Sequence, residues 1–329
     1  MQKKDIGLAV LVLVVGAVVA MINPRFLSPI NLANTANLIG LFGLFSLAEA
    51  FVIVTAGIEL SVGSIIALLG VLFVDMIVVQ DIPWPIAMII VLVLGAILGL
   101  IHGLLVTRLN LQPFVVTLCG LLIYRGIARF YTADGTAGFS FGDEFPLLEW
   151  LVSGRTNGVP HSIIAFGIIA VIAWFVLHRT VFGRHLFAVG KNEEAARFAG
   201  INTSRVIIMA YVICAVLTGL SAIFFAMYTR SIQPSSHGNF YELYGIAAAV
   251  LGGFSLRGGE GSIIGVVLGV ILLQMLQNLV NLLGIPSSLN FAVMGSVILI
   301  GVIADTQISK YRQGRRQSQA LAGLRQKEN

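Results

Sequence analysis

The chain has 329 residues, of which 57% are hydrophobic and 11% are charged, and its formal net charge is +5. A soluble domain carries about 25% charged residues, so this composition excludes an ordinary soluble protein. The apolar runs are continuous and about 20 residues long, which predicts transmembrane helices rather than the alternating strands of a β-barrel. We therefore expect an all-α fold, a polytopic transmembrane helical bundle.

About ten spans are predicted in chain order, at 6–22, 36–56, 62–79, 85–106, 113–131, 162–177, 206–228, 241–256, 262–283 and 289–304. The first follows Lys3 and Lys4 as a signal peptide would. No small-residue cleavage site comes after it, so we expect an uncleaved span. The membrane domain then covers 1–305, and 306–329 forms a basic cytoplasmic tail.

The 20 lysine and arginine residues are distributed unevenly among the predicted loops. With both termini in the cytoplasm, most of them fall on the cytoplasmic side, as positively charged loops do in membrane proteins. The acids of the long loop at 132–160 then fall outside. This topology accounts for the basic charge, so we expect a lipid membrane as partner and no nucleic acid.

The sequence contains no pattern that indicates catalysis or a metal site. The two cysteines, Cys119 and Cys214, both lie inside apolar runs and have no metal-ligand spacing. No Ser/His/Asp order or pair of carboxylates stands in a polar segment. The phosphate-binding pattern Gly-x-x-x-x-Gly-Lys-Ser/Thr is also missing, so this chain is not an ATPase.

Polar residues inside or between spans are candidates for a substrate pathway, because an ionisable group within a membrane is costly. The candidates are Glu49, Glu59, Ser61, Ser64, His102 and Asn37. The acid of the segment at 57–64 can instead cap the third span, where a negative charge is stabilised. Glu49 can contact substrate, pair with His102 or Arg125, or carry a proton. Asn37, spaced by three from Asn34, can instead cap the second span.

One charged block, at 183–201, lies between two apolar spans. Asn192 is a candidate N-cap, and Glu193 and Glu194 follow it, which predicts a helix over 192–198. Such a helix suits insertion into a groove of a soluble partner; the alternative is a solvated basic loop. The docking residues would be Gly183, Arg184, Gly190, Asn192, Glu193, Glu194, Ala195, Arg197 and Gly200.

Four motifs in order resemble one family, the inner-membrane permease subunits of bacterial ABC importers for monosaccharides, of the ribose/xylose/galactose type. They are GIELSVGS at 57–64, LQPFVVTLCGLLIYRGIA at 111–128, GRHLFAVGKNEEAARFAGI at 183–201 and YELYGIAAAVLGGFSLRGGEGSIIG at 241–265.

The resemblance implies a dimer with a second permease copy or a homologue, located in the bacterial inner membrane. Soluble ATPase subunits would attach on the cytoplasmic face and use ATP and Mg, while this chain binds no cofactor itself. A periplasmic or extracellular solute-binding protein would deliver the substrate. The block at 183–201 would be the coupling helix that docks on the ATPase.

Several positions depart from the family pattern. Glu59 stands where the family usually has Asp, His102 where Asn is common, Ala56 in place of a Gly, and Glu49 where the family is usually apolar. Each lies in or near the expected pathway, so the sequence leaves the sugar open. It also leaves an alternative, an ion-coupled secondary transporter that uses Glu49 or Glu59.

Overall fold

The computed structural model describes residues 3–140 and 142–286, together with residues 289, 292, 295, 296 and 299. Its helices are α1 (Lys3–Ile22), η1 (Pro24–Leu27), α2 (Pro29–Ile53), α3 (Val62–Val78), α4 (Trp84–Arg108), α5 (Pro113–Tyr131), α6 (Pro146–Ser153), α7 (His161–Arg179), α8 (Val181–Lys191), α9 (Glu193–Phe198), α10 (Thr203–Thr229), α11 (Tyr241–Leu251) and α12 (Ile263–Leu282). Two short antiparallel ladders pair β1 (Ala137–Gly138) with β4 (Ser231–Ile232) and β2 (Arg155–Thr156) with β3 (Val159–Pro160).

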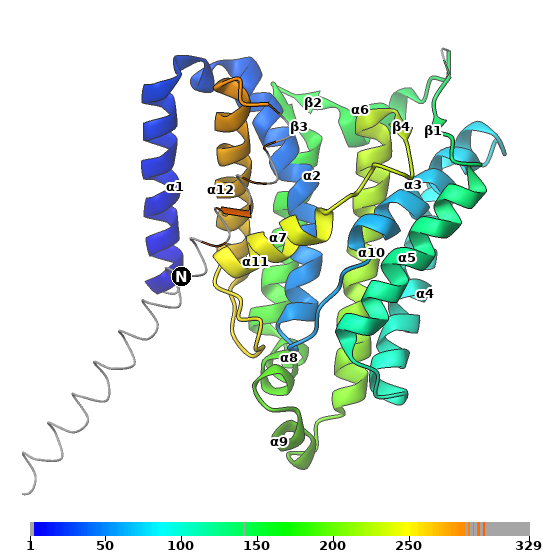
Figure 1. The fold of residues 1–329 in the computed structure, drawn as a ribbon, viewed down its shortest axis with the longest axis vertical. Helices are drawn as coiled ribbons and strands as arrows, with labels where there is room; N and C mark the ends of the chain where they lie inside the picture. The colour runs from blue at the N-terminus through cyan, green and yellow to red at the C-terminus, as the bar shows by residue number, and fades with distance from the viewer. Residues whose placement is uncertain are drawn as a thin grey trace, which may run out of the picture.

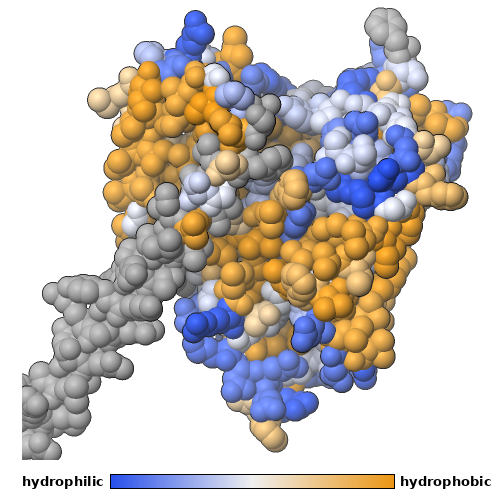
Figure 2. Space-filling model, in the orientation of Figure 1, coloured by the Kyte–Doolittle hydropathy of each residue, from blue (hydrophilic) through white to orange (hydrophobic). Residues whose placement is uncertain are grey.

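The helical membrane fold is confirmed. Within the described part of the chain, seven helices are long and apolar enough to cross a membrane: α1, α2, α4, α5, α7, α10 and α12. Figure 2 shows a hydrophobic band around the middle of the molecule and hydrophilic residues gathered toward its two ends. Proline in the first turn starts α2, α4 and α5, where its missing N–H costs nothing.

The span predicted at 241–256 is wrong. α11 has 11 residues, which reach about 16 Å at 1.5 Å per residue, against roughly 30 Å of bilayer hydrocarbon. It lies across the bundle in Figure 1. The helix ends at its C-cap Gly252, because the next residue, Gly253, takes a left-handed φ of +90° with which a helix does not continue. Gly252 also packs directly on α12, since a Cβ added to it would lie 2.4 Å from the Gly265 carbonyl carbon.

Two other predictions have different outcomes. α3 forms where a span is predicted, but its 17 residues place it among the shorter apolar helices. The tenth span, at 289–304, and the basic tail, at 306–329, lie outside the described residues apart from the isolated positions given above.

The long helix α10 lies at the centre and packs against α2, α3 and α4. A glycine on α4 makes the closest approach possible, because a Cβ on Gly99 would lie 2.4 Å from the Tyr211 carbonyl oxygen of α10. Phe45 and Phe51 of α2 and Phe73 of α3 are fully or almost fully buried in the same core. Most of α2 is therefore enclosed by protein rather than by lipid.

The bundle has two ends, which we name for the helices there (Figure 1). The α9 end carries α8 and α9, and the α6 end carries α6 and both ladders. α2 ends near α8, and the chain then runs back into the interior as an extended segment before α3 begins at Val62. This return segment, residues 57–61, places polar side chains inside the bundle.

Candidate functional site

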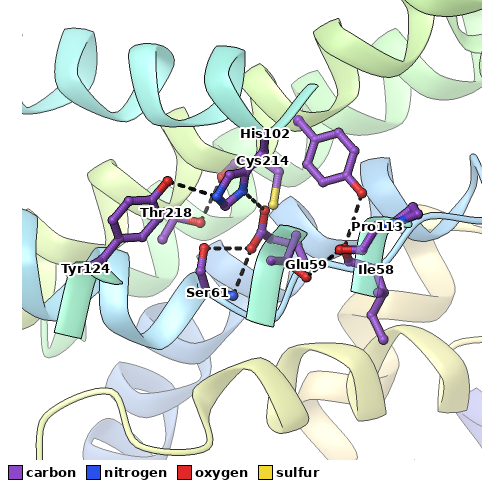
Figure 3. A network of polar contacts seen from close by, with 10 residues as sticks. Ile58, Glu59, Ser61, His102, Pro113, Tyr124, Cys214 and Thr218 are labelled. Atoms are coloured by element: carbon purple, nitrogen blue, oxygen red, sulfur yellow. Dashed lines mark hydrogen bonds and ion pairs between the residues drawn. The ribbon is translucent and has the colours of Figure 1, made fainter. Parts of the chain in front are cut away.

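A connected set of buried polar side chains lies where the return segment meets α4 and α5 (Figure 3). The Oε1 of Glu59 accepts hydrogen bonds from the backbone N–H of Ser61 at 2.8 Å and from its hydroxyl at 2.7 Å. The Oε2 of Glu59 lies 2.7 Å from Nδ1 of His102, whose Nε2 lies 2.8 Å from the hydroxyl of Tyr124. We call these four residues the buried polar network.

The return segment holds Glu59 in place through backbone contacts. The hydroxyl of Tyr211 on α10 donates to the carbonyl of Ile58 at 3.2 Å. Ser61 is the N-cap residue of α3, so Glu59 binds the residue that starts this helix. The Glu59 carboxylate bonds this N-cap residue itself, and it also joins the start of α3 to α4 and, through His102, to α5.

The network is enclosed and its polar atoms are paired. Glu59 is 2% exposed and His102 is 1% exposed. A glycine makes room for the ring, because a Cβ on Gly120 of α5 would lie 2.6 Å from Nε2 of His102. With its proton on Nδ1, His102 donates to Glu59 and accepts from Tyr124. The arrangement cross-links the start of α3 to α4 and α5.

Two departures from the family pattern are therefore in contact. Glu59 and His102 are 43 positions apart in sequence, and their side chains form a hydrogen bond of 2.7 Å. The sequence offered Glu49 as one partner for His102, and that pairing is wrong. Tyr124 and Tyr211 were not predicted as site residues, because tyrosines in apolar helices carry no local signal of a polar contact.

A second polar group lies between α2, α3 and α11. Glu49 is fully buried, and neither of its carboxylate oxygens has a hydrogen-bond partner within the described part of the chain. The buried Ser64 hydroxyl likewise has no hydrogen-bond partner among the described residues. Glu49 packs against α11, where a Cβ on Gly245 would lie 2.9 Å from its Cγ. Arg125, the other proposed partner of Glu49, donates instead to the carbonyls of the loop before α11.

Glu242 on α11 is a buried acid that the sequence analysis missed. It is 7% exposed, and a Cβ on Gly63 of α3 would lie 3.0 Å from its Oε2. Its position in the apolar run at 241–251 is the signal that could have identified it, because an ionisable group inside a predicted span is costly and is therefore a candidate functional residue. The carboxylates of Glu49 and Glu242 thus border the same three-helix contact.

Aromatic rings fill the space beside Glu49. Phe45 stacks on Tyr241 with ring centroids 5.5 Å apart and an interplanar angle of 11°. Phe42 and Phe225 pack around them at centroid distances of 5.1 to 6.3 Å. Such aromatic faces beside polar oxygens have the chemistry that suits a sugar, which has apolar C–H faces and hydroxyl edges. The packed rings hold this space closed.

Asn37 lies apart from both groups. Its side chain and its carbonyl accept hydrogen bonds from the Ser162 hydroxyl of α7. The N-cap of α2 is Ser28, whose hydroxyl accepts from the backbone of Asn31, so the prediction that the asparagines cap this helix is wrong. The structure brings Glu59, Ser61 and His102 together, with Ser64 and Glu49 nearby in the same core, and does not bring Asn37 to them.

The predicted helix at 192–198 forms as α9. Asn192 is its N-cap, and the side-chain oxygen accepts from the backbone of Ala195 at 2.9 Å. The residues of the docking block then divide by exposure. Exposed are Arg184, Asn192, Glu193, Glu194, Ala195, Arg197 and Gly200, whereas Gly183 and Gly190 are buried in α8. The sequence missed Phe198 at the end of α9, whose side chain is 87% exposed.

The donor set for a metal ion is missing from the described residues, which contain no group of three or more His, Cys, Asp or Glu side chains that could hold one. The paired Glu59 and His102 supply two such groups at most.

We expect Glu49→Leu to raise the thermal stability of the purified chain. The substitution removes two buried oxygens that have no hydrogen-bond partner among the described residues, and such a group costs about 1–3 kcal/mol. Thermal unfolding in detergent measures the shift. Glu49→Gln keeps a polar group of the same shape and should give little of this gain; a leucine variant that melts below the parent chain would contradict the prediction.

The chain is similar to known proteins over most of its length. A family model described as branched-chain amino acid transport system / permease component matches residues 31–302. The chain is 36% identical over 306 residues to ribose import permease protein RbsC of Escherichia coli strain K12, covering 93% of this chain and 94% of that protein. The identity to the protein of the same name from Bacillus subtilis strain 168 is 40% over 317 residues, with 94% of each chain covered.

A third relative is galactose/methyl galactoside import permease protein MglC of Escherichia coli strain K12. It is 31% identical over 320 residues, covering 92% of this chain and 94% of that protein. No solved structure matches the chain. The described residues that form the buried polar network and α9 all lie inside the matched region.

Proposed function

Since the chain belongs to the family of branched-chain amino acid transport system permease components, we propose that it is the membrane permease subunit of a bacterial ABC importer for a monosaccharide or a related small polar solute. The relatives that support the sugar are named for ribose and galactose. The structural observation that carries the coupling is α9, a capped helix whose surface is exposed at one end of the bundle.

The orientation follows from charge. We place the α9 end and the N-terminus in the cytoplasm, because that choice puts most lysines and arginines inside. The α6 end then faces the periplasm or the cell exterior and would meet a solute-binding protein. There the Arg230 guanidinium pairs with the Glu149 carboxylate at 2.6 Å. This ion pair joins α6 to the segment after α10 and so helps to hold the surface at this end in one conformation.

A separate ATPase would dock at α9 and would use ATP and Mg, and this chain would bind no cofactor. The exposed Glu193, Glu194 and Arg197 supply charged contacts, and Phe198 supplies an apolar one. A second permease copy or a homologue would complete the transporter in the inner membrane. Alternating access would then open the closed interior around Glu59 and Glu49 in turn to each side.

One observation favours a second candidate. Glu49 is a buried carboxyl without a hydrogen-bond partner among the described residues, and such groups serve as proton sites in secondary transporters. An ion-coupled carrier of a small polar solute is therefore the alternative.

Uptake into proteoliposomes separates the two functions. The chain is reconstituted with its cognate ATPase and solute-binding protein, and uptake is measured with the parent ATPase and with its phosphate-binding lysine replaced. The importer requires uptake to vanish with the lysine. Uptake that survives this change and collapses when the proton gradient is dissipated would establish the alternative.

Phe198→Ala should weaken the binding of the ATPase. A large aromatic side chain that becomes buried at the centre of an interface is worth about 2 kcal/mol, or roughly thirtyfold in affinity. Titration of purified ATPase onto the permease in nanodiscs measures it. The matched control is Phe130→Ala, since Phe130 is 89% exposed on α5 near the other end; equal affinities of the two variants would remove Phe198 from the interface.

A further inference from the structure

Three backbone segments cross without side chains between them at the α9 end. They are the turn after α2, the last turn of α8 and the loop between α11 and α12. The backbone N–H of Gly259 donates to the carbonyl of Val54 at 2.8 Å. We call Val54, Ala56, Gly190, Gly258 and Gly259 the glycine junction.

The junction has no space for side chains at its glycines. A Cβ on Gly190 would lie 1.8 Å from the Val54 carbonyl oxygen and 2.5 Å from the Gly259 nitrogen. A Cβ on Gly258 would lie 2.7 Å from the Gly190 carbonyl oxygen and equally close to the Ala56 nitrogen. Gly258 and Gly259 also take φ values of +76° and +69°, which favour glycine. The contact is therefore one of backbone on backbone.

Each segment leads from the junction to a different functional element. From Gly190 the chain passes through Asn192 directly into α9. From Val54 it turns into the return segment that carries Glu59. From Gly259 it runs forward to Ser262, the N-cap of α12, and backward to α11.

The ion pair at the same place is too exposed to form the link. Lys191 and Glu260 approach to 3.4 Å, with side chains that are 70% and 58% exposed, and an exposed pair of this kind contributes little. Backbone contacts without intervening side chains transmit displacement more directly, because close-packed contacts do not deform continuously.

We propose that the glycine junction is a rigid link that makes α9 move as one body with the return segment and with the loop between α11 and α12. The proposal rests on the proposed function, in which α9 receives the movement of the ATPase. Gly190, Gly258 and Gly259 are positioning residues in this scheme. They act on the buried interior through the backbone of the three segments and touch no substrate.

A reversible cross-link tests the rigidity. Lys191→Cys and Glu260→Cys are combined in a chain with Cys119→Ser and Cys214→Ala, so that oxidation joins the α8 end to the loop. Uptake and ATP hydrolysis are measured in proteoliposomes before oxidation, after it, and after reduction. A rigid link predicts that the oxidised chain keeps at least about half of the uptake of the reduced chain. Loss of uptake that reductant restores would show that the segments separate during transport and would overturn the proposal.

A substitution that separates the segments of the junction gives a second test of the link. Gly259→Ala introduces a Cβ that would lie 2.8 Å from the Cα of Lys191, which forces the two segments apart. We expect the number of molecules transported per ATP to fall about tenfold, while ATPase binding and basal hydrolysis stay within about twofold. The control is Gly167→Ala on α7, where a Cβ meets nothing within 4 Å.

The ratio of transport to hydrolysis separates coupling from folding. A merely structural role would lower uptake and hydrolysis together with the amount of folded complex. Unchanged transport per ATP in Gly259→Ala would contradict the link. Failure of the proposed function is a different result, because the parent chain itself would then show no uptake that depends on the ATPase.

Discussion

Glu59→Leu is expected to cause a large loss of stability. It leaves the Ser61 N–H, the Ser61 hydroxyl and the Nδ1 of His102 buried without their acceptor. Each buried donor left without its acceptor costs about 1–3 kcal/mol. Thermal unfolding of the purified chain in detergent, together with uptake in proteoliposomes, measures the effect.

A matched control exists in the same core. Glu49 is also a fully buried acid, but its oxygens have no partner among the described residues. Glu49→Gln should therefore change the melting temperature little. If Glu59→Leu costs no more than Glu49→Gln, the hydrogen bonds of the buried polar network do not stabilise the fold.

The contact between Glu59 and His102 adds a sharper test. The resemblance described above makes Asp and Asn the expected residues at these positions, so the pair Glu59→Asp and His102→Asn exchanges both sides of one contact. Each single change should lower stability, and the double variant should recover a coupling energy of about 1–3 kcal/mol. Purely additive effects would show that the two departures are independent.

Reversing both acids of α9, with Glu193→Lys and Glu194→Lys, is expected to abolish coupled transport without preventing membrane insertion. Both residues are exposed in the first turn of α9, where positive charge opposes the helix dipole and inverts the surface offered to a partner. Like charges placed against each other at an interface cost several kcal/mol, so uptake should fall by at least about tenfold. Copurification of the ATPase and substrate-stimulated hydrolysis are the measurements.

The control for this charge reversal is Glu144→Lys. Glu144 is an exposed acid in the loop before α6, at the other end of the bundle. Its reversal should leave copurification of the ATPase unchanged. Normal transport by the α9 double variant would show that these two acids do not couple the ATPase to the permease.

The sequence by itself predicted the elements whose signals are local. Continuous apolar length marked the long spans, and the helix at 113–131 has the predicted bounds. The cap at Asn192 and the acids after it located α9, because a capping bond joins residues three apart. Such features depend on a few neighbouring residues, so they can be read along the chain.

The exposure of two residues and the length of one helix could not be predicted from the sequence in this way. Gly190 and Phe198 belong to the same charged block, yet the structure buries the first and exposes the second. α11 has the hydropathy of a span but stops at Leu251, because Gly253 takes a left-handed φ of +90°. Hydropathy measures transfer into an apolar environment and does not distinguish lipid from a neighbouring helix.

The tertiary structure alone decided which polar residues act together. Glu59, His102 and Tyr124 come from the return segment, α4 and α5, and their contacts depend on how these segments pack. Glu49, an equally buried acid, has no hydrogen-bond partner in the part of the chain that the structure describes. Sequence could place a charge inside the membrane, where it is costly; only the approach of distant helices determined whether a partner lay within hydrogen-bonding distance.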